Sequence, residues 1–146
     1  MVLICPDRMG EVLLLQYIVG CAQYKMGVVE SPVLRLYSNN LNGGFGPNDL
    51  TVLADLTEVT SSGYAPITLV PANWTTTQTG GGVTSAVYSE ETFTFGTDAT
   101  AYGYYVTTTD DNEPAQLLWL EQFSGAPFRI PDGGGTISIT AKLTLS

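Results

Sequence analysis

Residues 136–145 alternate without error between apolar side chains and hydroxyl or charged side chains. The apolar set is Ile137, Ile139, Ala141, Leu143 and Leu145, and the residues between them are threonines, a serine and a lysine. Because successive side chains of a strand point to opposite faces, this period of two predicts a strand with one buried face and one face in water. This segment is therefore expected to belong to a packed β-sheet.

The composition extends this expectation to most of the chain. Of its 146 residues only 13% are charged and 44% are hydrophobic, and threonine, glycine and tyrosine are abundant, as in all-β proteins. Further strands are predicted around Leu34 and Leu36 and at residues 65–70, 74–77, 87–95, 101–107, 116–123 and, more weakly, 52–56. About eight short antiparallel strands, separated by turn residues, favour a jelly-roll-like β-sandwich.

The N-terminal part of the chain differs from the remainder in charge. Residues 1–30 have a net charge of −1, from three acids and two bases, whereas residues 31–146 have −8, from eleven acids and three bases. A nearly neutral, apolar segment joined to an acidic body indicates that the two parts face different surroundings. We therefore predict an apolar helix and arm at residues 1–32 and a β-sandwich domain at residues 33–146.

The predicted N-terminal helix is apolar on more than one side. Leu14, Tyr17 and Ile18 share one helical face, whereas Leu13 and Leu15 lie on other faces. An apolar helix at the edge of a β domain requires a second surface to cover it, so these five residues are predicted to contact another chain. The apolar run at residues 12–19 is far too short to span a bilayer, and no membrane partner is expected.

The two cysteines leave two alternatives open. Residues 18–21 have the form of a bacterial lipoprotein cleavage box at Cys21, but the preceding stretch contains two acids and a single arginine in place of a positive n-region. A disulfide between Cys5 and Cys21 requires the segment to fold back on itself. Two reduced thiols are the favoured state for a protein assembled in a reducing cytoplasm.

The composition argues against most catalytic and nucleic-acid-binding functions. The chain has no histidine, and its two Gly-Gly-Gly runs lack the Lys and Ser/Thr that follow a phosphate-binding loop. A net charge of −9 argues against nucleic acid as a partner. We therefore expect no enzyme activity, no cofactor and no metal site. The open alternatives are a calcium site at Asp110, Asp111 and Glu113 and paired carboxylates among Glu90, Glu91 and Glu121.

Two of the predicted strands carry large side chains on both faces. They are residues 102–106 and 117–123, a pattern typical of the middle of a sandwich or of a subunit contact. Tyr105, Leu118 and Trp119 are therefore predicted as contact residues alongside the N-terminal leucines. Exposed aromatics could alternatively form a platform for a sugar. Most of the aromatics, however, alternate along their strands in phase with the residues expected in the core, which favours packing.

An ordered series of short motifs resembles a family of small tailed-phage virion proteins. The motifs include Leu34-Arg35-Leu36-Tyr37-Ser38-Asn39-Asn40, Leu56-Thr57-Glu58, Gly63-Tyr64-Ala65, Ala72-Asn73-Trp74, Tyr102-Gly103-Tyr104-Tyr105-Val106, Leu117-Leu118-Trp119-Leu120-Glu121-Gln122-Phe123 and the terminal strand with its final serine. They follow the apolar segment after Pro6 and cover nearly the whole chain. Each motif alone is only a strand and a turn, so their order carries the resemblance.

The resemblance implies a function and a location. Proteins of this kind are capsid cement or decoration proteins with a jelly-roll body and no catalytic residues. It implies a structural protein on the capsid surface of a bacteriophage virion, with the major capsid protein and sister copies as partners, and symmetric closure favours a homotrimer. The alternative is a virion fibre or lectin-like module that binds a cell-surface glycan.

Overall fold

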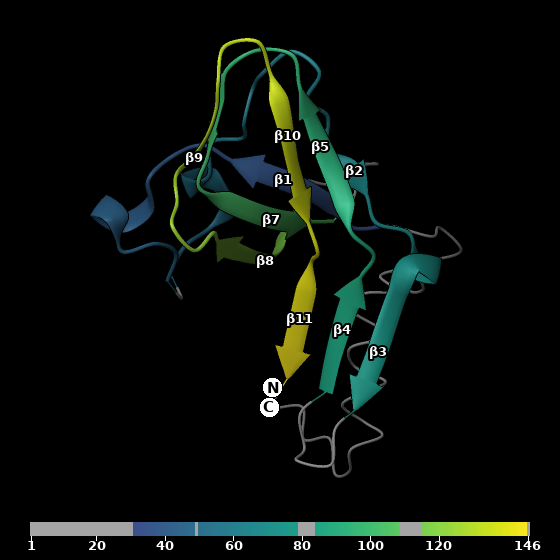
Figure 1. Ribbon diagram of the computed structural model, residues 1–146. Coiled ribbons are helices and arrows are strands. Elements are labelled where there is room, and N and C mark those ends of the chain that lie inside the picture. Colours follow the sequence, from purple (N-terminus) through teal and green to yellow (C-terminus); the bar gives the residue numbers. More distant parts are fainter. Residues whose placement is uncertain (1–30, 49, 79–83, 109–114, 146) are drawn as a thin grey trace. The chain divides into compact units, whose positions relative to one another are not determined.

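The computed structural model describes residues 31–48, 50–78, 84–108 and 115–145, and these residues form an all-β, sandwich-like fold (Figure 1). All the strand pairs are antiparallel. Three short 3-10 turns interrupt the strands, at η1 (Leu41–Gly44), η2 (Leu53–Asp55) and η3 (Pro71–Asn73). The strands are β1 (Val33–Tyr37), β2 (Ile67–Thr68), β3 (Trp74–Gln78), β4 (Thr84–Tyr88), β5 (Glu91–Phe95), β6 (Ala99–Ala101), β7 (Gly103–Thr107), β8 (Leu117–Gln122), β9 (Phe128–Ile130), β10 (Gly135–Ile139) and β11 (Lys142–Leu145).

The predicted all-β class is confirmed, whereas several predicted strands are divided. The segments expected at residues 87–95, 101–107 and 136–145 each contain a break, so that they become β4 and β5, β6 and β7, and β10 and β11. Backbone groups at these breaks are hydrogen-bonded: Tyr102 N donates to Tyr37 O at 2.9 Å, and Tyr88 N donates to Ala141 O at 2.9 Å. The breaks are therefore bends in paired backbone, and the predicted helix before residue 31 lies outside the described residues.

The weak strand predicted at residues 52–56 is wrong, because this segment contains the turn η2. Its Asp55 carboxylate accepts the Val52 amide at 2.9 Å, which closes the chain into a tight turn. Asn39 then fastens the turn to the end of β1, since its amide donates to Asp55 O and its carbonyl oxygen accepts from Thr57 N, both at 2.8 Å.

The pairing of the strands from β4 to β11 is nested. β7 pairs with β8, β6 with β9, β5 with β10 and β4 with β11, so the inner pairs are closest in sequence and the outer pairs farthest apart. These eight strands are the two arms of one long hairpin that turns between β7 and β8. A jelly roll is built by rolling up an eight-stranded ribbon with this order of pairs. The second edge of β7 pairs with β1, which precedes the hairpin in the chain.

The chain divides into two compact units. Within the described residues, unit 1 comprises residues 31–32, Leu69–Glu91 and Ile139 to the end of β11, and unit 2 comprises Val33–Thr68 and Thr92–Ser138. Residues 33–146, expected as one β domain, therefore contribute to both units.

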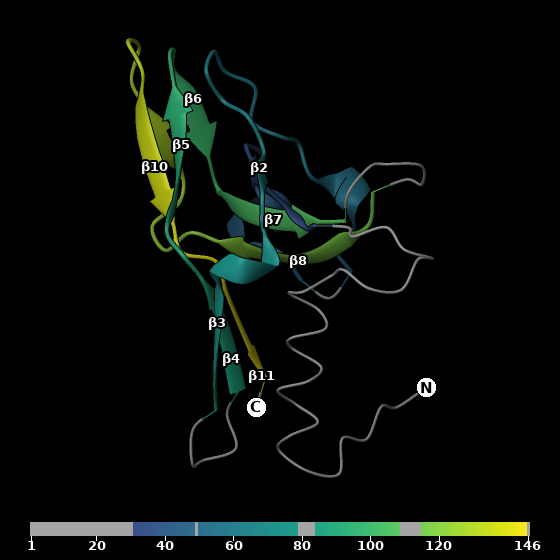
Figure 2. The same cartoon turned by 90° about the vertical axis from the view of Figure 1, so that its right-hand side faces the viewer.

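Unit 1 is built on the three-stranded sheet β11-β4-β3, whose strands lie side by side in Figures 1 and 2. Trp74 and Leu143 pack against the buried Ala86 on one face of this sheet. The Trp74 ring meets the Tyr88 ring edge to face at 5.0 Å. The Tyr88 hydroxyl accepts hydrogen bonds from Val70 N at 2.9 Å and from Asn73 Nδ2 at 3.2 Å, which holds the turn η3 against β4.

Unit 2 contains the four-stranded sheet β2-β1-β7-β8, the pair β6–β9 and the pair β5–β10 except for its end residues Glu91 and Ile139, which belong to unit 1. Every residue of β7 is buried, as the large side chains on both of its faces predict. Tyr64 joins the sheet to β5: its hydroxyl accepts Leu36 N at 3.0 Å, and its ring stacks on Phe93 at 5.5 Å and on Phe95 at 6.0 Å. One tyrosine thus fixes two layers of unit 2 to each other.

Candidate protein-interaction site

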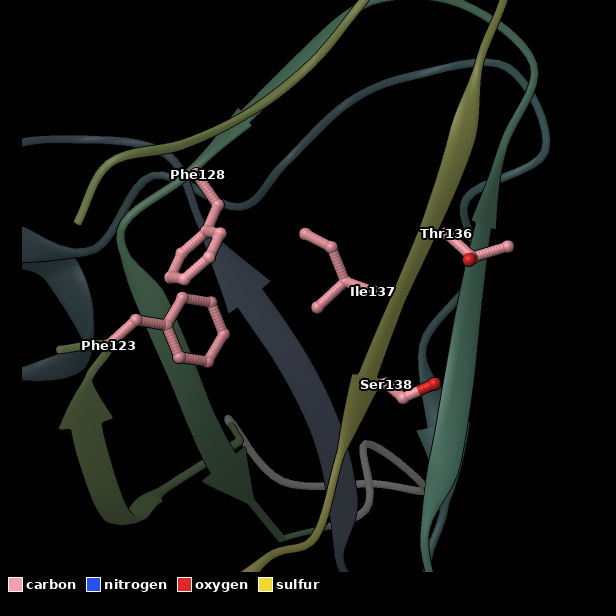
Figure 3. A pocket seen from close by; sticks show the side chains of 5 residues that line it. All are labelled: Phe123, Phe128, Thr136, Ile137 and Ser138. Atoms are coloured by element: carbon pink, nitrogen blue, oxygen red, sulfur yellow. The ribbon is translucent and has the colours of Figure 1, made fainter. Parts of the chain in front are cut away.

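A small open cavity lies in unit 2 beside β9 and β10 (Figure 3). It has a volume of about 260 Å³ and is lined by Phe123, Phe128, Thr136, Ile137 and Ser138, and we call it the corner pocket. Phe123 and Phe128 meet edge to face with their centroids 5.4 Å apart. Figure 3 shows Ile137 pointing from β10 toward these two rings, whereas Thr136 and Ser138 point to the other side of the strand. The corner pocket therefore offers an aromatic and aliphatic wall with no charged side chain in its lining.

The largest exposed apolar side chain of the described residues is on a turn after β1. Phe45 is 95% exposed, and it stands in the sequence Leu41 to Asn48, which we call the Phe45 turn. Leu41 anchors the turn by packing with Tyr37 and Tyr105 in the core of unit 2. Asn42 Nδ2 donates to Gly46 O at 2.6 Å, and Gly46 N donates to Leu41 O at 3.3 Å. The Phe45 ring is therefore held out into solvent by an ordered turn.

A charged cluster on β1 forms the edge of a second open cavity of about 290 Å³. Arg35 Nη1 contacts Glu58 Oε2 at 2.9 Å, and the other oxygen of Glu58 accepts the Tyr64 hydroxyl at 3.0 Å. Burial, together with the neighbouring Glu58 carboxylate, raises the pKa of Tyr64 far above its usual value. Both carboxylate oxygens of Glu58 have a partner within the fold, so this cluster is a structural link between β1, the segment after η2 and Tyr64.

The predicted contact residues fall into three groups. Leu13, Leu14, Leu15, Tyr17 and Ile18 lie outside the described residues. Tyr105 is 3% exposed and packs in the core with Tyr37 and Leu41. Leu118 and Trp119 are half-buried neighbours on β8, at the end of the four-stranded sheet. The described structure thus brings Leu118 and Trp119 together on one strand and places Tyr105 inside unit 2.

The acidic residues offered two alternative sites, one for calcium and one with paired carboxylates. The acidic residues Asp110, Asp111 and Glu113 lie outside the described residues. Glu121 accepts the Tyr104 hydroxyl at 2.6 Å. Within the described ranges no group of three Cys, Asp or Glu side chains could hold a metal ion. Nor is any helix of that part of the chain long and apolar enough to cross a membrane.

Sequence reasoning missed the two most exposed phenylalanines. Phe45 stands in Asn42-Gly43-Gly44-Phe45-Gly46-Pro47, where four glycine and proline neighbours indicate a turn that has no core face. An aromatic residue in such a turn is a signal of an exposed apolar side chain. Phe128 gave no comparable signal, because β9 has only three residues and follows a proline. The aromatics predicted to pack inside include Tyr88 and Tyr104, and both are buried, whereas Tyr105, predicted as a contact residue, is buried as well.

Comparisons with known proteins found no relative. No family model matches the chain, no curated protein is similar to it, and no solved structure matches its fold.

Proposed function

We propose that the protein is a structural component of a bacteriophage virion, a cement or decoration protein that binds the outside of the capsid lattice and stabilises it. The ordered motifs of the chain support this proposal, because they resemble those of small tailed-phage virion proteins. The single structural observation that supports it best is the Phe45 ring, held in solvent by an ordered turn of an acidic protein. An apolar side chain presented in this way fits a contact with another protein.

The proposed action is mechanical. A clamp that binds only the assembled lattice shifts the equilibrium toward assembly by mass action, by about 2.7 kcal/mol per site when its free concentration is a hundred times its Kd. Many equivalent sites on one shell multiply this gain. In this proposal the apolar segment at residues 12–19 contacts the major capsid protein or sister subunits, and the acidic β body projects outward as a homotrimer.

The proposal is tested by locating the protein on particles. Particles purified from cells that produce the protein should show it by cryo-electron microscopy as a regular decoration of the shell, with a fixed number of copies per capsid subunit. A variant that lacks residues 1–27 should no longer decorate the shell, while its circular dichroism stays that of a β protein. Saturation of the same sites by this variant would contradict the proposed role of the N-terminal segment.

The same preparation distinguishes the rival function. A fibre or lectin-like protein would occur at one vertex or on the tail and would bind defined sugars on a glycan array. Specific glycan binding, combined with the absence of the protein from the capsid surface, would overturn the cement proposal.

A further inference from the structure

The Phe45 turn is preorganised for insertion into another surface. Asn42 has a φ of 50°, a left-handed conformation that residues other than glycine adopt infrequently and that persists only where surrounding contacts fix it. Its side chain supplies one such contact, the bond to Gly46 O, and the buried Leu41 supplies another. A turn fixed in advance loses little conformational entropy when its exposed ring enters a partner.

The corner pocket has the size and chemistry of a receptor for one apolar side chain. Its volume of about 260 Å³ is below the roughly 300–1,000 Å³ of pockets that bind drug-sized ligands. Its wall is the edge-to-face pair Phe123 and Phe128 with Ile137, and Phe128 is 48% exposed. A third ring entering there gains both apolar burial and a further aromatic contact.

The turn and the pocket are close to each other on one copy. A Cβ atom added at Gly46 would collide with the side-chain amide of Gln122, so the turn rests directly on the residue that precedes Phe123. Both features belong to unit 2. Each copy therefore carries one projecting Phe45 ring and one corner pocket on neighbouring segments. In a closed symmetric assembly, each copy can place its ring in the pocket of another copy.

The distribution of charge is compatible with a second copy of the chain as the partner. With a net charge of −9, two copies repel each other unless the surfaces that meet are neutral. The Phe45 turn, Leu41 to Asn48, has no charged residue, and neither does the lining of the corner pocket. The two complementary features thus coincide with uncharged parts of an acidic chain.

We propose that Phe45 of one copy inserts into the corner pocket of a second copy, against Phe123, Phe128 and Ile137. This contact rests on the self-association in the proposed function and specifies where two copies meet, and it does not depend on which lattice the protein binds. Reciprocal insertion closes a dimer, and cyclic insertion closes a trimer.

The test uses the full chain in sedimentation equilibrium. Wild-type protein should self-associate, and Phe45→Ser should weaken each contact about thirtyfold, the change expected when a central aromatic of an interface is lost. Val70→Ser, which removes an exposed apolar side chain of unit 1, is the matched control and should associate as the wild type does. Thermal unfolding should be unchanged in both variants, because the side chains removed are exposed.

A mixing experiment identifies the receptor. Phe128→Ala should also dissociate, since it removes one wall of the corner pocket. Phe45→Ser retains an intact pocket and Phe128→Ala retains an intact Phe45, so an equimolar mixture should regain one of the two kinds of contact and associate more strongly than either variant alone. Raising the salt concentration should strengthen association of the wild type, because it screens repulsion between acidic copies.

Three results would overturn the proposal: a wild-type chain that is monomeric at all concentrations, a Phe45→Ser variant that associates normally, or a mixture no stronger than its components. A wild-type chain that is monomeric would also remove the homotrimer from the proposed function, whereas decoration of the capsid is measured separately, on particles. Loss of decoration with normal self-association would count against the proposed function alone.

Discussion

The two units of the chain use the same device, a tyrosine hydroxyl that accepts a backbone amide, beside different sets of buried side chains. In unit 2, Tyr64 accepts Leu36 N and stacks on two phenylalanines. In unit 1, Tyr88 accepts Val70 N and meets Trp74 edge to face. Among the described residues, the buried aromatic rings of unit 2 include Tyr37, Phe93 and Phe95, whereas the buried side chains of unit 1 are fewer and include Leu69, Ala86 and Tyr88. Of the described residues, those of unit 2 are therefore expected to contribute the larger share of the stability.

The largest expected effect tests this difference directly. Phe93→Ala removes a buried ring of unit 2 and should lower the free energy of unfolding by about 3–5 kcal/mol. Trp74→Ala in unit 1 should cost clearly less, because that ring is only half-buried. Denaturant unfolding measures both values. Equal losses would show that the two units contribute equally.

The second prediction concerns close packing inside unit 2. Gly103→Ala would place a Cβ against Glu121 O and 2.6 Å from Cε1 of Tyr37, and overpacking of this kind should cost about 1–3 kcal/mol. Gly135→Ala is the matched control, since its nearest neighbour is the Cγ2 methyl of Ile130 at 3.3 Å, with no backbone atom nearby. Chemical denaturation of both variants measures the loss of stability. An unchanged free energy of unfolding for Gly103→Ala would mean that the sheet shifts freely there.

The third prediction compares the two tyrosines. Tyr64→Phe removes the bonds from Leu36 N and to Oε1 of Glu58 and should cost about 2 kcal/mol, because one of the lost bonds is to a carboxylate. Tyr88→Phe loses bonds from neutral donors and should cost about 1 kcal/mol. Thermal melts of the two variants decide the order, and the reverse order would contradict the special strength of the Glu58 bond.

The smallest effect is expected at Tyr37. Its buried hydroxyl has no hydrogen-bond partner within the described residues, so Tyr37→Phe should change stability by less than about 1 kcal/mol at pH 7.

At high pH the free energies of unfolding of the wild type and of Tyr37→Phe should diverge. Burial raises the pKa of Tyr37 to about 12, from 10.0. The unfolded chain therefore loses this proton first, and the wild type loses stability as the pH rises from 10 to 12. Tyr37→Phe should lose less over that range. Unfolding curves at pH 8, 10 and 11 measure the difference, and parallel curves would show that Tyr37 ionises as a free tyrosine does.

The alternation of apolar and polar residues predicted which side chains face the core, but it predicted the ends of the strands poorly. Along β10 and β11 the parity of Ile137, Ile139, Ala141 and Leu143 holds across the break, because a bend in paired backbone keeps the alternation of side chains. The breaks themselves depend on hydrogen bonds to remote residues, such as Tyr102 N to Tyr37 O, which no local pattern records. β9 was missed because three residues carry too little pattern.

The candidate site was predictable in part. An aromatic between glycines in the Phe45 turn signals an exposed ring, and this signal is local. The corner pocket joins residues of β9 and β10 with the residue after β8, so it depends on pairing that the sequence alone does not reveal.

The nested pairing of β4 to β11 has a consequence for the order of folding. Pairing β7 with β8 closes only the short loop of chain between them. In the folded protein, Thr108 N donates to Gln116 O at 3.0 Å at the base of this loop. Once that pair has formed, β6 and β9 are brought close, and each later pair closes a loop that the previous pair has already shortened. A chain with many distant contacts can then fold by zipping outward, at a lower entropic cost for each step than its sequence separations imply. Cutting the chain between β7 and β8 should therefore slow folding far more than it lowers the stability of the folded protein.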